Sequence, residues 1–143
     1  RALASLTRET VTGWVRRYSG GPSPLERPAR PMRWKVTAIA IGSGSVPVLA
    51  TPRVIALCEQ TSVKAMENDL EPGTTTVGMR VQLDHLAPTP VGQTVSCEAT
   101  LESVTGRRVN FTVSVNDARG LVAAGKITRV VVDTERFLEK ANG

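Results

Sequence analysis

The sequence predicts an α+β domain in which one long helix is wrapped by a curled antiparallel sheet of about five strands. A helical pattern, with apolar residues three and four positions apart, lies within residues 45–70. One strand-like run precedes it, at 34–41, and four follow it, joined mainly by short turns. One strand, one helix and then four successive strands favour an antiparallel sheet packed on the helix.

Residues 1–33 are predicted to be a basic extension and linker, ahead of a single domain over 34–143. Residues 1–35 carry eight basic and two acidic groups, a balance of +6, whereas the whole chain carries +5. The positive charge is therefore an N-terminal property, and we expect no nucleic-acid groove on the domain. Residues 19–32 are rich in Gly and Pro, as linkers are.

Residues 1–18 have two interpretations that bear on location. The segment is basic, rich in Ser and Thr and apolar at helical spacing, and residues 16–19 are similar to a matrix-protease cleavage site. A transit peptide would place the protein in the mitochondrial matrix. An ordinary amphipathic helix or an added tail leaves it in the cytoplasm, which is our expectation.

The helix is predicted to begin at Thr51, as N-cap, with Pro52 at its first position. Pro72 and Gly73 end the segment. Glu59 lies two turns into the helix, where packing on a sheet would begin to bury it, so its carboxylate needs a partner or a function.

Four strands and a short amphipathic tail are predicted after the helix. Their ranges are 75–86, 91–104, 109–115 and 121–132, with the tail at 134–141. Thr105-Gly106 is a hairpin signal between the second and third of these strands.

Composition excludes several kinds of site. No apolar run approaches the roughly 20 residues of a membrane span. One histidine in the chain excludes a multi-histidine metal site, and Cys58 and Cys97 lack metal-ligand spacing. We interpret the two cysteines as buried thiols rather than a disulfide. The G-x-S-x-G elbow of serine hydrolases and the Gly-rich phosphate loop are both missing from the sequence.

Several short motifs together resemble one enzyme family. The run HLAPTPVGQTV at 85–95 is similar to a strand–Pro–Gly–strand passage of hot-dog thioesterases. More narrowly, VLAT at 48–51, Glu59, Gly78, His85 and GRR at 106–108 resemble the fluoroacetyl-CoA thioesterase-like family. The resemblance covers about 36–138 and implies a hot-dog fold.

The resemblance also implies an activity and an assembly. The expected reaction is hydrolysis of a small or medium acyl-CoA thioester, without metal or redox cofactor, coenzyme A being part of the substrate. The expected assembly is a homodimer or higher oligomer with active sites at the subunit interface. The alternative function is a non-catalytic hot-dog module that binds acyl-CoA or serves in assembly.

By the same resemblance, Thr51, Glu59 and His85 are catalytic, while Gly78 and Arg129 bind substrate. Each residue also has a plainer interpretation. Thr51 could be only a helix cap, Glu59 only a helix carboxylate and His85 only a strand-end histidine. Gly78 could mark only a bulge, and Arg129 could be only a surface cation. Residues 41–48 contain no aromatic residue, although the family's best-known member has aromatic side chains there, so we expect a more open and less selective acyl pocket. The helix contains no histidine, which argues against a hot-dog hydratase.

Overall fold

The computed structural model describes Thr10–Val11 and residues 36–143. The interpretations of residues 1–9 and 12–35, as transit peptide, tail or linker, lie outside these described residues. Within the described ranges, neither helix has the length and apolarity needed to cross a bilayer.

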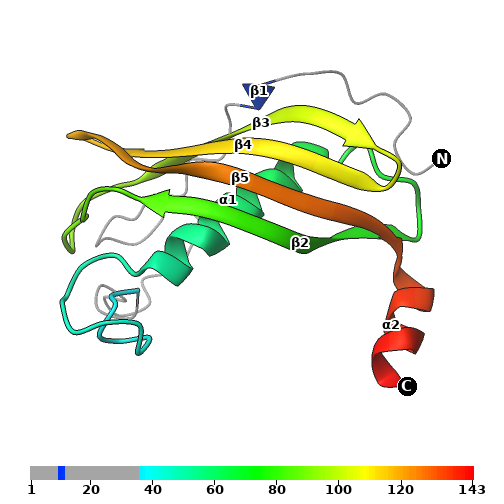
Figure 1. Cartoon of the computed structure of the whole chain (residues 1–143), viewed down its shortest axis with the longest axis horizontal. Helices are drawn as coiled ribbons and strands as arrows, with labels where there is room; N and C mark the ends of the chain where they lie inside the picture. Colours follow the sequence, from blue (N-terminus) through cyan, green and yellow to red (C-terminus); the bar gives the residue numbers. More distant parts are fainter. Residues whose placement is uncertain (1–9, 12–35) are drawn as a thin grey trace, which may run out of the picture.

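One long helix lies across one face of an antiparallel sheet (Figure 1). The helix is α1, Thr51–Met66, and a second short helix, α2, covers Thr134–Asn142. The strands are β1 Thr10–Val11, β2 Thr74–His85, β3 Ser96–Thr105, β4 Arg108–Asp117 and β5 Gly120–Asp133. Their order in the sheet is β1-β3-β4-β5-β2. The predicted α+β architecture is confirmed.

The predicted first strand is wrong in its described part, residues 36–41. This segment forms turns, with one isolated bridge between Thr37 and Leu49. The Ile41 N–H donates back to the Thr37 carbonyl and the Ser43 N–H to the Ala38 carbonyl, so these amides are used locally rather than in a ladder. The sheet's fifth strand is β1 instead.

Three other boundaries differ from the sequence prediction: the start of one strand and both ends of the helix. The strand expected from residue 91 begins only at Ser96, because Gly92 has a φ of 93° and Gln93 N–H closes a turn onto the Pro90 carbonyl. The helix ends at Met66, and its N-cap is Ala50 rather than Thr51. Thr51 is the first helical residue, and its hydroxyl is bonded elsewhere.

The core lies between α1 and the inner face of the sheet. Phe111, 1% exposed, is the largest fully buried side chain, and the core around it is aliphatic. Buried hydroxyls on α1 form hydrogen bonds to backbone carbonyls of the same helix; for example, Thr61 Oγ1 donates to the Leu57 carbonyl at 2.8 Å. Cys58 and Cys97 are buried free thiols with sulfurs 3.8 Å apart, as predicted. Their burial beside each other raises the pKa of the Cys58 thiol.

Candidate active site

Thr51 and His85 form the first polar cluster. Thr51 opens α1 and His85 ends β2, and Thr51 Oγ1 lies 2.8 Å from His85 Nδ1. The other ring nitrogen, Nε2, is buried and has no hydrogen-bond partner in the described part of the chain. Burial lowers the pKa of His85 below 6.5, although a hydrogen bond with the Ala87 backbone opposes this. The imidazole is therefore neutral at pH 7, and its buried Nε2 is not used by any other group of the described residues.

A set of loop contacts holds Thr51 and His85 next to each other. We call these contacts the latch; they join residues 86–89 to Leu49, Asp117 and Val122. The Leu86 and Ala87 amides both donate to the Val122 carbonyl, which fixes the chain just after His85. The Leu49 amide donates to the Thr89 carbonyl at 2.9 Å, which fixes the chain just before Thr51. The segment after His85 is therefore bonded both to β5 and to the lead-in of α1.

Asp117 anchors the latch from the end of β4. Its carboxylate accepts from Thr89 Oγ1 at 3.1 Å and from the Arg119 amide at 2.8 Å. The side chain is only 2% exposed. Burial alone would raise the pKa of Asp117, but the hydrogen bonds from Arg119 and Thr89 and the Arg119 charge together lower it. The latch is therefore built around an ionised carboxylate at neutral pH.

Glu59 and Arg129 form the second polar cluster. Arg129 Nη1 donates to Glu59 Oε2 at 2.7 Å, while Nε donates to the Thr76 hydroxyl and Nη2 to the Thr76 carbonyl. Arg129 is 6% exposed, so it is a buried cation rather than a surface one. Burial lowers the pKa of Arg129 and the Glu59 carboxylate opposes that shift, so the guanidinium stays charged.

Gly78 allows Glu59 to approach β2 closely. A Cβ at this position would overlap Glu59 Oε2, so any larger residue would displace the carboxylate. Gly78 also sits at a register shift between β2 and β5, and its pairing partner is Arg129. The bulge interpretation of this glycine is therefore confirmed, whereas its role in binding substrate stays a prediction.

A cavity of about 490 Å³ opens beside Glu59. Besides Glu59 and Arg129, it is lined by Ala56, Gln60, Val63 and Lys64 of α1 and by Glu67, which follows the helix. Gln60 Oε1 is buried with no hydrogen-bond partner in the described residues, which leaves an acceptor next to the carboxylate. The cavity thus combines a few polar groups with an apolar wall, as small-molecule sites do.

Within one chain the two clusters do not meet. Thr51 and Glu59 are eight residues apart on α1, or about 12 Å along its axis at about 1.5 Å per residue. The structure therefore brings Thr51 to His85, and Glu59 to Gly78 and Arg129, but not Thr51 to Glu59.

Sequence reasoning missed three polar residues here. Gln60 carried a weak signal, because it neighbours Glu59 and lies in the same helix. Thr89 and Asp117 carried none, since a turn-rich loop and a strand end do not reveal that they will meet across the fold. In the described residues there is no group of three or more His, Cys, Asp or Glu side chains that could hold a metal ion.

Known structures identify the class of protein. The solved structure of the fluoroacetyl-CoA thioesterase FlK superposes with a TM-score of 0.79 at 27% identity, over 97% of this chain and 96% of that one. A hot-dog-like protein from Thermanaerovibrio acidaminovorans gives a TM-score of 0.63 at 30% identity, over 66% and 70% of the chains. The chain is a hot-dog thioester hydrolase.

The family follows from the sequence comparison. The family model for the fluoroacetyl-CoA-specific thioesterase FlK matches residues 33–135, and the chain belongs to this family. A fluoroacetyl-CoA thioesterase from Streptantibioticus cattleyicolor is 39% identical over 93 residues, which are 65% of this chain and 67% of that protein. These matches identify an acyl-CoA thioesterase.

Proposed function

We propose that this enzyme hydrolyses small and medium acyl-CoA thioesters with Thr51, Glu59 and His85, and without a metal or redox cofactor. The observation that carries the proposal is the Thr51–His85 pair, in which the other ring nitrogen of His85 is buried and has no hydrogen-bond partner among the described residues. Thioester hydrolysis needs an attacking group, a donor to the developing oxyanion and a proton for the leaving thiolate. The two polar clusters together contain groups suited to all three tasks.

His85 serves as the proton-handling group. When Thr51 donates to Nδ1, the neutral ring carries its proton on Nε2, which then donates to the thioester carbonyl or to the departing sulfur. Glu59 attacks the carbonyl directly or activates a water, with Arg129 holding its carboxylate in place. Gly78, which has no Cβ, lets the Glu59 carboxylate lie against the β2 backbone, and the substrate carbonyl is proposed to bind beside that carboxylate.

The acyl range is proposed to be broad. The segment ahead of Thr51 has no aromatic side chain between residues 41 and 48, and it exposes Ile41 and Val46. Leu86, next to His85, is also exposed. Small aliphatic side chains leave more room than rings, so kcat/KM should vary little from short to medium acyl chains. A strong preference for one short acyl group would contradict this point.

The working enzyme is proposed to be a homodimer that pairs β2 with β2 of a second copy. In the described part of the chain β2 is a twelve-residue edge strand, and such edges need cover. Antiparallel pairing about a point midway between Gly78 and His85 would set each His85 opposite the partner's Gly78. Glu59 of one subunit would then approach the Thr51–His85 pair of the other, which removes the separation of about 12 Å seen along α1.

Thiol release from a panel of acyl-CoAs, acetyl to about octanoyl with fluoroacetyl included, tests the catalytic assignment. Glu59→Gln and His85→Ala should each lower kcat by about 100-fold or more. Glu67→Gln is the matched control, because this exposed carboxylate lines the rim of the same cavity and pairs with Lys64. Unchanged turnover in both site variants would refute the assignment. Binding of CoA esters without any turnover would favour the non-catalytic module.

Mixing inactive variants tests the shared site. Glu59→Gln and His85→Ala subunits, unfolded and refolded together, should regain about a quarter of wild-type activity, since half the dimers then hold one intact site of two. Mixing Thr51→Val with His85→Ala is the control, because these residues act within one chain and no intact site can form. No recovery in the first mixture, with heterodimers present, would place the whole site in one chain.

A further inference from the structure

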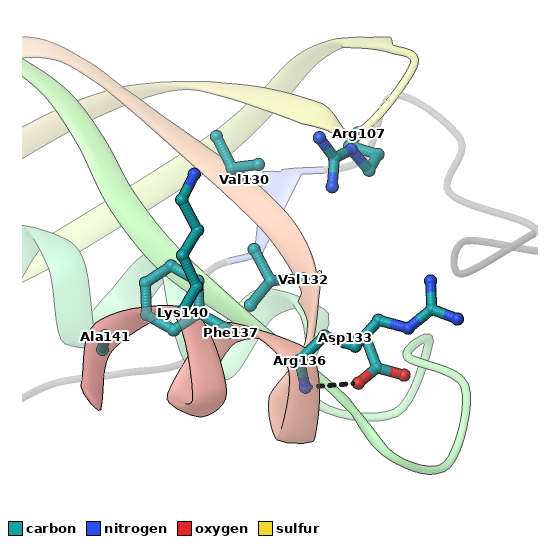
Figure 2. Close-up of a pocket in the computed structure, with 8 residues that line it drawn as sticks. All are labelled: Arg107, Val130, Val132, Asp133, Arg136, Phe137, Lys140 and Ala141. Carbon is teal, nitrogen blue, oxygen red and sulfur yellow. Dashed lines mark hydrogen bonds between the residues drawn. The ribbon is translucent and has the colours of Figure 1, made fainter. Parts of the chain in front are cut away.

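A second cavity, of about 550 Å³, lies on the sheet face opposite α1 (Figure 2). Side chains alternate along a strand, and Arg129 and Val131 of β5 point toward α1, one to Glu59 and one into the core. Val130 and Val132 therefore point the other way, where they line this cavity. The cavity is thus separated from Glu59 by the sheet itself.

The cavity has an apolar floor and a basic rim. Val130 and Val132 form the floor, and α2 adds Phe137, whose ring is partly exposed at 40%. Arg107, from the turn between β3 and β4, lies on one side of the floor and Lys140 of α2 on the other (Figure 2). The carbonyl of Arg107 accepts from the Val131 amide at 2.8 Å, so the turn that carries this arginine is fixed against β5.

The rim charges are not balanced within the site. Arg107, Arg136 and Lys140 line the cavity, and none of them forms an ion pair with another residue in 36–143. Among the described residues, Asp133 is the one carboxylate that lines the cavity, and it is already used: its Oδ1 accepts from the Arg136 amide at 3.0 Å and caps α2. Three cations around an apolar floor attract an anion that also has an apolar body.

We propose that this cavity binds a phosphorylated nucleotide. Arginine and lysine are the usual phosphate ligands, and guanidinium groups bind phosphate through two parallel hydrogen bonds. A base has a π-face that can stack on the Phe137 ring and contact the two valines beneath it. The volume lies within the range of about 300–1,000 Å³ typical of small-molecule sites.

The nucleotide has two chemical sources, which share a phosphoadenosine group. One is the nucleotide end of an acyl-CoA, and the other is a free nucleotide that binds independently of the reaction. The inference does not depend on the catalytic assignment, because binding is measured without turnover.

Isothermal titration of the full-length protein with adenosine 3′,5′-bisphosphate tests the site. Arg107→Ala and Lys140→Ala should each raise Kd about tenfold, and Phe137→Leu, which keeps apolar bulk but removes the ring, about threefold. Lys126→Ala is the matched control. It also removes one positive charge, from an exposed position of β5, the strand that carries Val130 and Val132, but Lys126 does not line the cavity. Its Kd should stay within twofold of wild type. No binding by the wild type, or equal losses in the control, would overturn the proposal.

A kinetic arm separates the two sources. If the substrate supplies the nucleotide, Lys140→Ala should raise KM for an acyl-CoA and leave KM for the matching acyl-pantetheine unchanged. If neither KM changes while bisphosphate binding is lost, the site serves a free nucleotide. Either result keeps the site, whereas an equal rise in KM for both thioesters would refute it as a nucleotide site.

Discussion

Replacing Gly78 with alanine should inactivate the enzyme without unfolding it. The new Cβ would overlap Glu59 Oε2, so the carboxylate must leave its position on Arg129. Glu59 is 32% exposed and can move toward the adjoining cavity, whereas Arg129 stays buried and loses one of three side-chain hydrogen bonds. A charge-assisted hydrogen bond contributes about 1.5–3 kcal/mol, and the partial exposure of Glu59 reduces this to about 1–2 kcal/mol.

The effect on catalysis should exceed the effect on stability, because a 100-fold loss of rate corresponds to about 2.7 kcal/mol. A shift of about 1 Å in a reacting group costs about 100-fold in rate, so kcat for acyl-CoA hydrolysis should fall about 100-fold. The loss of 1–2 kcal/mol should lower Tm by only about 3–8 °C.

A double-mutant cycle in the Glu59→Gln background isolates the contact. Gly78→Ala should have little further effect on kcat there, because the group that it displaces has already lost its role. Thiol release and thermal unfolding of the four proteins provide the data. A Gly78→Ala enzyme that keeps kcat within threefold of wild type would refute the reasoning.

Three further predictions concern the Asp117 carboxylate, the His85 imidazole and the Phe111 ring. Asp117→Ala leaves the buried Thr89 hydroxyl without its acceptor, so it should destabilise the protein by about 1–3 kcal/mol in denaturant unfolding and lower kcat in thiol release. The control Thr89→Ser keeps the hydroxyl and should keep both stability and kcat near wild type. Burial lowers the pKa of His85, so the unfolded state binds more protons than the folded state, and stability should fall as pH drops below about 6.5. The value of kcat/KM should fall over the same acidic range, because the protonated imidazole can no longer act as the neutral catalytic group. A pH profile of His85→Gln that keeps the same acidic limb would contradict this. Phe111→Ala should cost about 3–5 kcal/mol in urea unfolding, and a loss under 1 kcal/mol would show that Phe111 is not central to the core.

The sequence predicted most of the fold because its main elements have strong internal periodicity. Val109 to Val115 alternate along β4, and the three-and-four spacing of α1 marks its buried face. The run at 36–41 shows why alternation alone is insufficient. Its pattern is that of a strand, yet the Ala40 and Ile41 amides bond to Thr37 within a turn, and a sequence pattern cannot rank turn hydrogen bonds against strand hydrogen bonds.

The candidate site was predictable only in part for a related reason. Thr51 carries a capping signal, but its hydroxyl bonds His85, 34 residues away, and Ala50 occupies the cap position. The partners of Asp117 and Arg129 depend on the register between distant strands. That register is settled by packing of the whole sheet, and no local pattern contains it.

The length of β2 also affects how readily the protein aggregates in solution. Among the residues that the structure describes, no strand covers the twelve-residue edge of β2, and such an edge is a template on which an extended chain can add a strand. β2 also contains no proline to interrupt that pairing. Met79 on this edge is also exposed. If a second copy of the chain covers β2, diluting the protein will dissociate the dimer. Dissociation would remove the activity and expose the edge of β2 together. Concentration, rather than core strength, would then set the shelf life of the enzyme.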